Sequence, residues 1–106
     1  MLVSVYMMPR EKACSGALCP IKKTAGLLSD IWTILIIREL ILSDQRFCEL
    51  ENSLSGISTR TLTLKLKKLI EEKLVEKTDT NYILTKKGRK LSEVFDAMNA
   101  YGKKYL

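Results

Sequence analysis

Histidine is absent from the 106 residues, and phenylalanine, proline and tryptophan occur only two, two and one times. Without histidine, the Ser-His and Cys-His pairs that activate catalytic nucleophiles cannot form. The five glycines build no phosphate-binding loop, and the acidic residues are scattered along the chain. We therefore expect neither an enzyme nor a bound cofactor.

Long apolar runs and grouped metal ligands are also missing. The longest apolar run, IWTILII, is far shorter than the roughly 20 residues of a membrane-spanning helix. The start, MLVSVYMMPREK, lacks the basic region that opens a signal peptide. No metal site is expected, because Cys14, Cys19 and Cys48 form no CxxC pair. The sequence predicts a cytoplasmic protein without membrane contact, whose cysteines are thiols.

The net charge of +6 is unevenly placed. Residues 1–57 carry six basic and six acidic side chains, whereas residues 58–78 carry six and three, and residues 85–106 carry six and two. This asymmetry favours a polyanionic partner, most often nucleic acid. The alternative is that the charge serves solubility alone.

Helix signals occupy most of the first 72 residues. Pro20 suits the first position of a short helix over 20–28, and an almost wholly apolar stretch predicts a buried helix over 31–42. We assign part of that burial to a second subunit. A short helix with Phe47, Leu50 and Leu54 on one face ends at the turn SLSG. Ser58 then caps a helix over 58–72 that buries one face, namely Leu62, Leu66, Leu69 and Ile70.

In LVEKTDTNYIL the helical spacing of apolar residues gives way to alternation, which predicts a short hairpin with its turn at Asp79 and Thr80. Thr85 can cap a final helix that runs to the C-terminus. Its apolar residues are spaced 3, 4, 3, 4, typical of two packed helices: Leu91, Val94, Met98, Tyr101 and Tyr105. The order of elements predicts one mainly α domain over 1–106 with a small β-hairpin, a dimeric winged helix-turn-helix whose terminal helices form the interface. Residues 19–84 form its core and wing, 1–18 an N-terminal extension and 85–106 the dimerisation helix.

The segment GISTRTLTLKLKKL has the features of a recognition helix, whose N-terminal end meets base edges in the major groove of duplex DNA. Arg60 can donate two hydrogen bonds to guanine, and Leu64 fits a thymine methyl group. The lysines suit phosphates. The predicted contacts here are Ser58, Thr59, Arg60, Thr61, Thr63, Leu64, Lys67 and Lys68. The alternative is an ordinary amphipathic helix with a solvated face.

Lys86 and Lys87 lie in the first turn of the predicted final helix, where the helix dipole disfavours cations. Phosphate contact is one explanation for this choice. Two solvated lysines are the other.

Taken together, these pieces resemble HxlR-type transcriptional regulators, a branch of the MarR-like winged helices. The matching segments, in family order over about 19–95, are CPIKKT, Trp32 with ILIIREL, RFCEL, GISTRTLTLKLKKL, LVEK and LTKKGRKL. The resemblance implies a homodimeric repressor or activator that binds double-stranded DNA, with Arg60 on the arginine of the family's Ser-x-Arg motif. Two departures stand out. Ser29, Asp30 and Ile31 replace a frequent Gly-Gly-Lys, and only KTDTN separates the strands, so Lys77 and Asn81 are expected to reach phosphates rather than the minor groove.

The resemblance also places Cys19 at a position that senses oxidants or electrophiles in some relatives. A thiol at a helix N-terminus, near Lys22 and Lys23, favours the thiolate. The alternative is a half-buried packing residue, and packing is what we expect of Cys48. The sequence does not identify an effector ligand. A different function also stays open: a winged helix that binds protein in transcription or replication machinery, without specific DNA binding.

Overall fold

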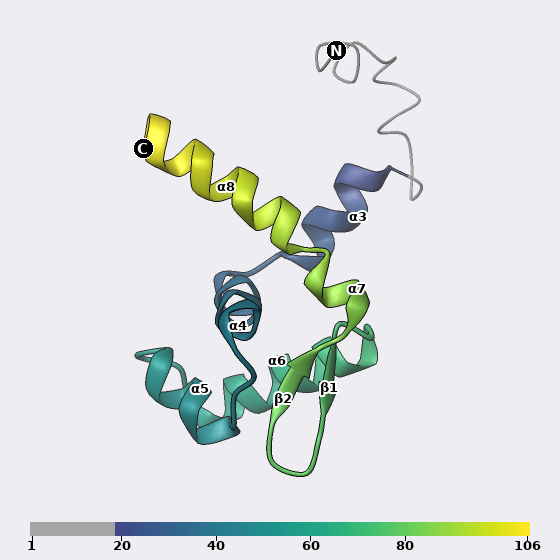
Figure 1. Cartoon of the computed structure of the whole chain (residues 1–106), viewed down its shortest axis with the longest axis vertical. Coiled ribbons are helices and arrows are strands. Elements are labelled where there is room, and N and C mark those ends of the chain that lie inside the picture. The colour runs from purple at the N-terminus through teal and green to yellow at the C-terminus, as the bar shows by residue number, and fades with distance from the viewer. Residues whose placement is uncertain (1–18) are drawn as a thin grey trace. The chain divides into compact units, whose positions relative to one another are not determined.

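The computed structural model describes residues 19–106, which form helices and one hairpin (Figure 1). The described residues fall into two units, residues 19–31 and residues 32–106. The elements, in order, are α3 (Pro20–Leu27), α4 (Ile31–Leu42), α5 (Phe47–Ser53), α6 (Thr59–Glu71), β1 (Val75–Lys77), β2 (Tyr82–Leu84), α7 (Lys86–Arg89) and α8 (Ser92–Tyr105).

Helix α3 is the described helix of the first unit. It begins at Pro20, as predicted, because a proline at the first helical position removes no intrahelical hydrogen bond. The Thr24 hydroxyl donates to the Pro20 carbonyl over 2.9 Å, and the Leu28 N–H donates to the Thr24 carbonyl over 3.1 Å, where the helix ends.

The core of the second unit gathers aliphatic side chains from α4, α5, α6, the hairpin and the segments beside them. Helix α4 contributes Ile36, Ile37 and Leu40, all fully buried. The other buried aliphatic residues are Leu50, Leu54, Leu62, Leu66, Leu69, Leu74, Val75, Leu84 and Leu91. Leu42 of α4 is 73% exposed and Ile31 is 65% exposed, so α4 is buried along one face rather than on most sides. Burial of the remaining faces by a second subunit stays a prediction.

Helices α5 and α6 form the helix-turn-helix. The turn between them contains Gly56 with φ 93°, a left-handed conformation that glycine adopts without steric cost. Ser58 caps α6 as predicted, since its hydroxyl accepts the N–H of Thr61 over 3.0 Å. Three of the four predicted core residues of α6 are buried, but Ile70 is 39% exposed. Ile70 lies at the edge of the buried face in the last turn, where the chain leaves the helix.

The hairpin has the predicted bounds and turn. Strands β1 and β2 are antiparallel, with Val75 opposite Leu84 and Lys77 opposite Tyr82. The sequence did not indicate its extension: Gln45, in the connector between α4 and α5, exchanges both backbone hydrogen bonds with Tyr82, over 2.7 and 3.2 Å. This pairing ties β2, at its end next to the hairpin turn, to the segment that leads into the helix-turn-helix.

The predicted single helix after Thr85 is wrong in one respect, because it is interrupted. Thr85 caps α7 by accepting the Gly88 N–H over 3.1 Å, as expected. Between α7 and α8 the bonds tighten: Leu91 N–H donates to Gly88 O over 3.1 Å, and Glu93 N–H to Lys90 O over 3.2 Å. Such i to i−3 bonds close a tighter turn than the α-helix. This turn separates the short helix next to the wing from α8.

Candidate nucleic-acid interface

The exposed face of α6 lies opposite its buried leucines. At about 100° per residue, the side chains on this face are Arg60, Thr63, Leu64, Lys67 and Lys68, all exposed. Leu64 is 53% exposed, so its methyl groups are available for an apolar contact. The face therefore combines one arginine, two lysines and one aliphatic side chain.

The hydroxyl groups of the first turn have partners within the protein. The Ser58 hydroxyl donates to the Thr61 hydroxyl over 2.9 Å, in addition to its capping bond. The Thr63 hydroxyl donates to the Thr59 carbonyl over 2.8 Å. These bonds fix the shape of the turn. A contact from one of these hydroxyl groups to DNA would therefore have to form in addition to its hydrogen bond within the protein.

Thr59 links the two helices of the motif. Its hydroxyl donates to Oε2 of Glu51 in α5 over 2.5 Å. The Glu51 carboxylate thereby lies beside the first turn of α6, where the helix dipole favours negative charge. Sequence reasoning missed Glu51, and an acidic residue eight positions before a helix start gives no signal that would have identified it.

Arg60 differs from its neighbours in the first turn. Its side chain is exposed and forms no hydrogen bond or ion pair within residues 19–106. The guanidinium is therefore available, at the N-terminal end of α6, to donate two parallel hydrogen bonds to one acceptor group.

Charge along α6 is graded. Its basic side chains are Arg60, Lys65, Lys67 and Lys68, whereas its acidic ones, Glu71 and the capping Glu72, lie in the last turn and at the C-terminus. The N-terminal two-thirds of the helix is therefore uniformly positive, and this is the end that enters a major groove in helix-turn-helix proteins.

The wing contributes two of the predicted residues. The Lys77 ammonium lies 5.7 Å from the centroid of the Tyr82 ring, a cation–π distance. Asn81 closes the turn through its backbone, whose N–H donates to the Thr78 hydroxyl and whose carbonyl accepts the Thr78 N–H over 2.8 Å. Lys77 stays exposed at the end of β1.

The two lysines after Thr85 have different environments. Lys86 is exposed to solvent. Lys87 has a partner within the protein: its ammonium donates to the Glu72 carbonyl at the C-terminus of α6 over 3.1 Å. A cation is favoured at that end of a helix, so the unfavourable position in α7 is offset by a favourable one on α6.

The cysteines are placed differently from one another. Cys19 precedes α3 and is 2% exposed, and Lys22 and Lys23 in the first turn of α3 are exposed. Cys48 is exposed, so the expectation that it is a packing residue is wrong within this chain. Cys48 lies on the outer face of α5, one position from half-buried Phe47. Cys14 lies outside the described residues.

Two kinds of site are not found in the described part of the chain. Residues 19–106 contain no group of three His, Cys, Asp or Glu side chains that is able to hold a metal ion. No helix in the same range has the length and apolar character needed to cross a membrane.

Known proteins are similar to this chain in sequence and in fold. Residues 27–106 match the family described as HxlR-like helix-turn-helix. The chain is 34% identical over 99 residues to the HTH-type transcriptional regulator sll1512 of Synechocystis, covering 87% of this chain and 73% of that protein. It is 32% identical to the HTH-type transcriptional regulator YodB of Bacillus subtilis, covering 85% of this chain and 88% of YodB.

Solved structures agree with these relatives. A MarR-family transcriptional regulator from Porphyromonas gingivalis superposes with a TM-score of 0.82 at 29% identity, covering 88% of this chain and 98% of that one. The quinone-bound form of YodB superposes with a TM-score of 0.76 at 33% identity, covering 80% and 97%. The exposed basic helix of a helix-turn-helix, the short wing and these relatives lead to one conclusion. The chain belongs to the HxlR-like helix-turn-helix family and is a DNA-binding transcriptional regulator with a winged-helix fold.

Proposed function

We propose that the protein acts as a homodimer that lays α6 of each copy in successive major grooves on one face of duplex DNA. The observation that carries this proposal is the first turn of α6. There the hydroxyl groups of Ser58 and Thr59 have internal partners, and Arg60 extends from the same turn with none among the described residues. Dimers of this type read half-sites about one helical turn apart.

Arg60 is our choice for base reading, with two hydrogen bonds to guanine O6 and N7. Leu64, one turn further on the same face, suits the methyl group of thymine. Lys67 and Lys68 are assigned to phosphates. They lie on the exposed face about two turns after Arg60, and each carries a compact charge on a flexible side chain.

Ser58, Thr59, Thr61 and Thr63 receive a supporting role in this proposal. Their hydroxyls hold the helix start and its link to Glu51, and their small size lets the DNA backbone approach. Contacts from Lys77, Asn81 and Lys86 to flanking phosphates remain predictions. We assign Lys87 to the support of the end of α6, because its ammonium donates to the Glu72 carbonyl.

Dimerisation is supported by the apolar surface of α8. None of its residues is buried, and Met98, Tyr101 and Tyr105 are 47%, 60% and 62% exposed. Exposed apolar side chains grouped on one element mark an interaction surface. A homodimer formed through the terminal helices covers them.

The proposal is tested by measuring DNA affinity at several salt concentrations. Lys67→Ala is expected to weaken binding to a random duplex and to lower the slope of log affinity against log salt by about one for each phosphate that the variant no longer neutralises. Arg60→Ala is expected to affect a random duplex far less than a preferred site. If Arg60→Ala weakened binding to random and preferred DNA equally, as Lys67→Ala is expected to do, the assignment of Arg60 to base reading would be contradicted. A winged helix that binds only protein would show no affinity for either duplex, and the relatives do not favour that alternative.

A second proposal concerns regulation by oxidants or electrophiles through Cys19. Structures of the relative YodB exist in quinone-bound, diamide-treated and reduced forms. Cys19 lies at the N-terminal boundary of α3, where the dipole favours a thiolate, but its 2% exposure requires a local opening before it reacts. The cytoplasmic location stays a prediction from the sequence.

A further inference from the structure

An acidic side chain of α5 contacts the first turn of the basic helix α6. The Glu51 carboxylate accepts the Thr59 hydroxyl through Oε2 over 2.5 Å. Its other oxygen, Oε1, forms no hydrogen bond within residues 19–106, and the carboxylate forms no ion pair in that range. Glu51 therefore adds a negative charge and an unused hydrogen-bond acceptor to the end of α6 that enters a major groove.

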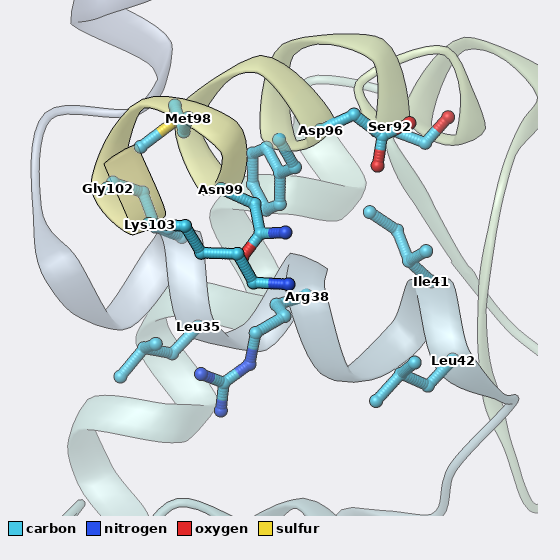
Figure 2. A pocket seen from close by; sticks show the side chains of 12 residues that line it. Leu35, Arg38, Ile41, Leu42, Ser92, Asp96, Met98, Asn99, Gly102 and Lys103 are labelled. Carbon is cyan, nitrogen blue, oxygen red and sulfur yellow. The ribbon is translucent and has the colours of Figure 1, made fainter. Parts of the chain in front are cut away.

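Other acidic side chains of the second unit have different surroundings. Asp44, in the connector between α4 and α5, lies 3.9 Å from the Arg89 guanidinium of α7. Glu49 of α5 accepts the Arg46 N–H over 2.8 Å. Asp96 belongs to α8 and borders a groove of about 690 Å³ between α4 and α8, as Figure 2 shows. Glu51 is distinguished from these residues by its contact with α6.

The bond from Thr59 places the Glu51 carboxylate close to Arg60 along the helix. Thr59 and Arg60 are consecutive, so their Cα atoms are about 3.8 Å apart, close to the roughly 3.4 Å between neighbouring base pairs. Their side chains diverge by about 100° around the helix axis. An acceptor held by Thr59 is therefore placed for a base pair adjacent to the one that Arg60 contacts.

The chemistry of the major groove determines which base suits this acceptor. Guanine presents two acceptors there, thymine presents one acceptor, and adenine combines an acceptor with an amino group. Cytosine presents only its N4 amino group, which is a donor. A carboxylate accepts hydrogen bonds and donates none, so it repels the acceptors and the phosphates. Cytosine is therefore the base that fits Glu51 best.

We infer that Glu51 is a specificity-determining residue, whose Oε1 accepts the N4 amino group of a cytosine next to the guanine that Arg60 reads. Thr59 is its positioning residue, because the Thr59 hydroxyl holds Oε2. This inference rests on the DNA-binding mode proposed above. The same carboxylate disfavours sites that present an acceptor at this position, since no donor then compensates its charge.

The test is a titration of three duplexes. The first is the site that the wild type selects, the second has thymine in place of the cytosine, and the third has adenine in place of the guanine. The wild type is expected to bind the first about tenfold more tightly than the second for each half-site changed. Glu51→Gln is expected to lose most of this difference, because its amide can also donate to thymine O4.

Glu49→Gln is the matched control for charge. It lies on the same helix and changes the net charge equally, and a glutamine keeps the capping bond from the Arg46 N–H. The preference of this variant for cytosine over thymine is expected to stay at the wild-type value.

Thr59 variants separate base reading from a purely structural link. Thr59→Val removes the hydroxyl and is expected to reduce the preference for cytosine severalfold, whereas Thr59→Ser retains the hydrogen bond and the preference. If Glu51 served only to link α5 to α6, Thr59→Val would lose stability and keep its base preference. Circular dichroism and urea unfolding verify that each variant is folded at the temperature of the titration.

A wild-type preference for cytosine in Glu51→Gln, or a selected site without cytosine beside the guanine, would overturn the inference. Arg60→Ala and the third duplex separate this failure from a failure of the proposed binding mode. If Arg60→Ala discriminates against adenine as the wild type does, the binding mode itself is overturned. If it loses that discrimination while Glu51→Gln behaves as the wild type, the binding mode holds and only the assignment of Glu51 is overturned.

Discussion

Replacing Gly88 with alanine tests how closely α7 is seated against the end of α6. A Cβ at this position would lie 2.3 Å from the Leu74 carbonyl oxygen and 3.0 Å from Cδ2 of Leu84. The Leu84 side chain is able to rotate away, but the Leu74 carbonyl is backbone and already accepts the Thr85 N–H over 3.0 Å. Relief of the clash therefore requires α7 to move away from the hairpin.

The cost can be estimated from three contributions. Overpacking costs about 1–3 kcal/mol, and a contact with backbone belongs at the upper end. A weakened hydrogen bond from Thr85 adds about 1 kcal/mol. The better helix propensity of alanine offsets about 1 kcal/mol. We expect Gly88→Ala to lower the free energy of unfolding by about 3 kcal/mol and the melting temperature by roughly 10 °C or more.

Urea unfolding at a fixed protein concentration measures this effect. The matched control is Gly26→Ala in α3, where an added Cβ meets nothing within 4 Å, and which should gain about 0.4–1 kcal/mol. If Gly88→Ala were as stable as the wild type, the reasoning would be refuted, because α7 could then accommodate the added Cβ beside the Leu74 carbonyl without loss of stability.

Three further predictions concern local features. Lys73 has φ 64° at the end of α6, so Lys73→Gly is expected to raise the free energy of unfolding by about 1 kcal/mol in the same urea assay, and a loss of stability would contradict the left-handed assignment. Ser58→Ala should cost about 1 kcal/mol and Ser58→Asp much less, since aspartate also caps; equal losses would argue against the capping bond. Diamide should change the DNA affinity of the wild type and of the Cys48→Ser control but not of Cys19→Ser, and unchanged affinity in treated wild type would leave Cys19 a packing residue.

Features set by neighbouring residues were predictable from the sequence. Ser58 and Thr85 were identified as caps because a cap needs only its own hydroxyl and an N–H three residues on. The hairpin followed from the change of period and the turn at Asp79 and Thr80. Each signal lies within a few residues of the structure that it predicts.

Features that join distant segments were not predictable. Gly88 approaches Leu74, Gln45 pairs with Tyr82, and no local pattern connects either pair. The tight turn between α7 and α8, closed by the bonds from the N–H groups of Leu91 and Glu93, was not indicated by any local pattern either. Periodicity alone favoured one continuous helix.

The candidate site shows the same division. The sequence indicated that Arg60 lies on the exposed face of α6, because helical spacing determines the face. It did not indicate that Thr59 is bonded to Glu51, or that Lys87 is bonded to the end of α6. Which polar groups are available to a ligand depends on these tertiary bonds, and for this reason our proposal assigns base reading to Arg60 and Leu64.

Selection of bound sequences from a randomised duplex library tests the central claim most directly. The wild-type protein is expected to recover a two-fold symmetric site with half-sites about one helical turn apart and a guanine in each half-site. Arg60→Ala is expected to recover the same symmetry without the guanine preference, and with affinity for the original site lower by about 1–3 kcal/mol per half-site. Recovery of an unchanged sequence preference by Arg60→Ala would contradict the assignment of α6 as the element that reads DNA through this residue.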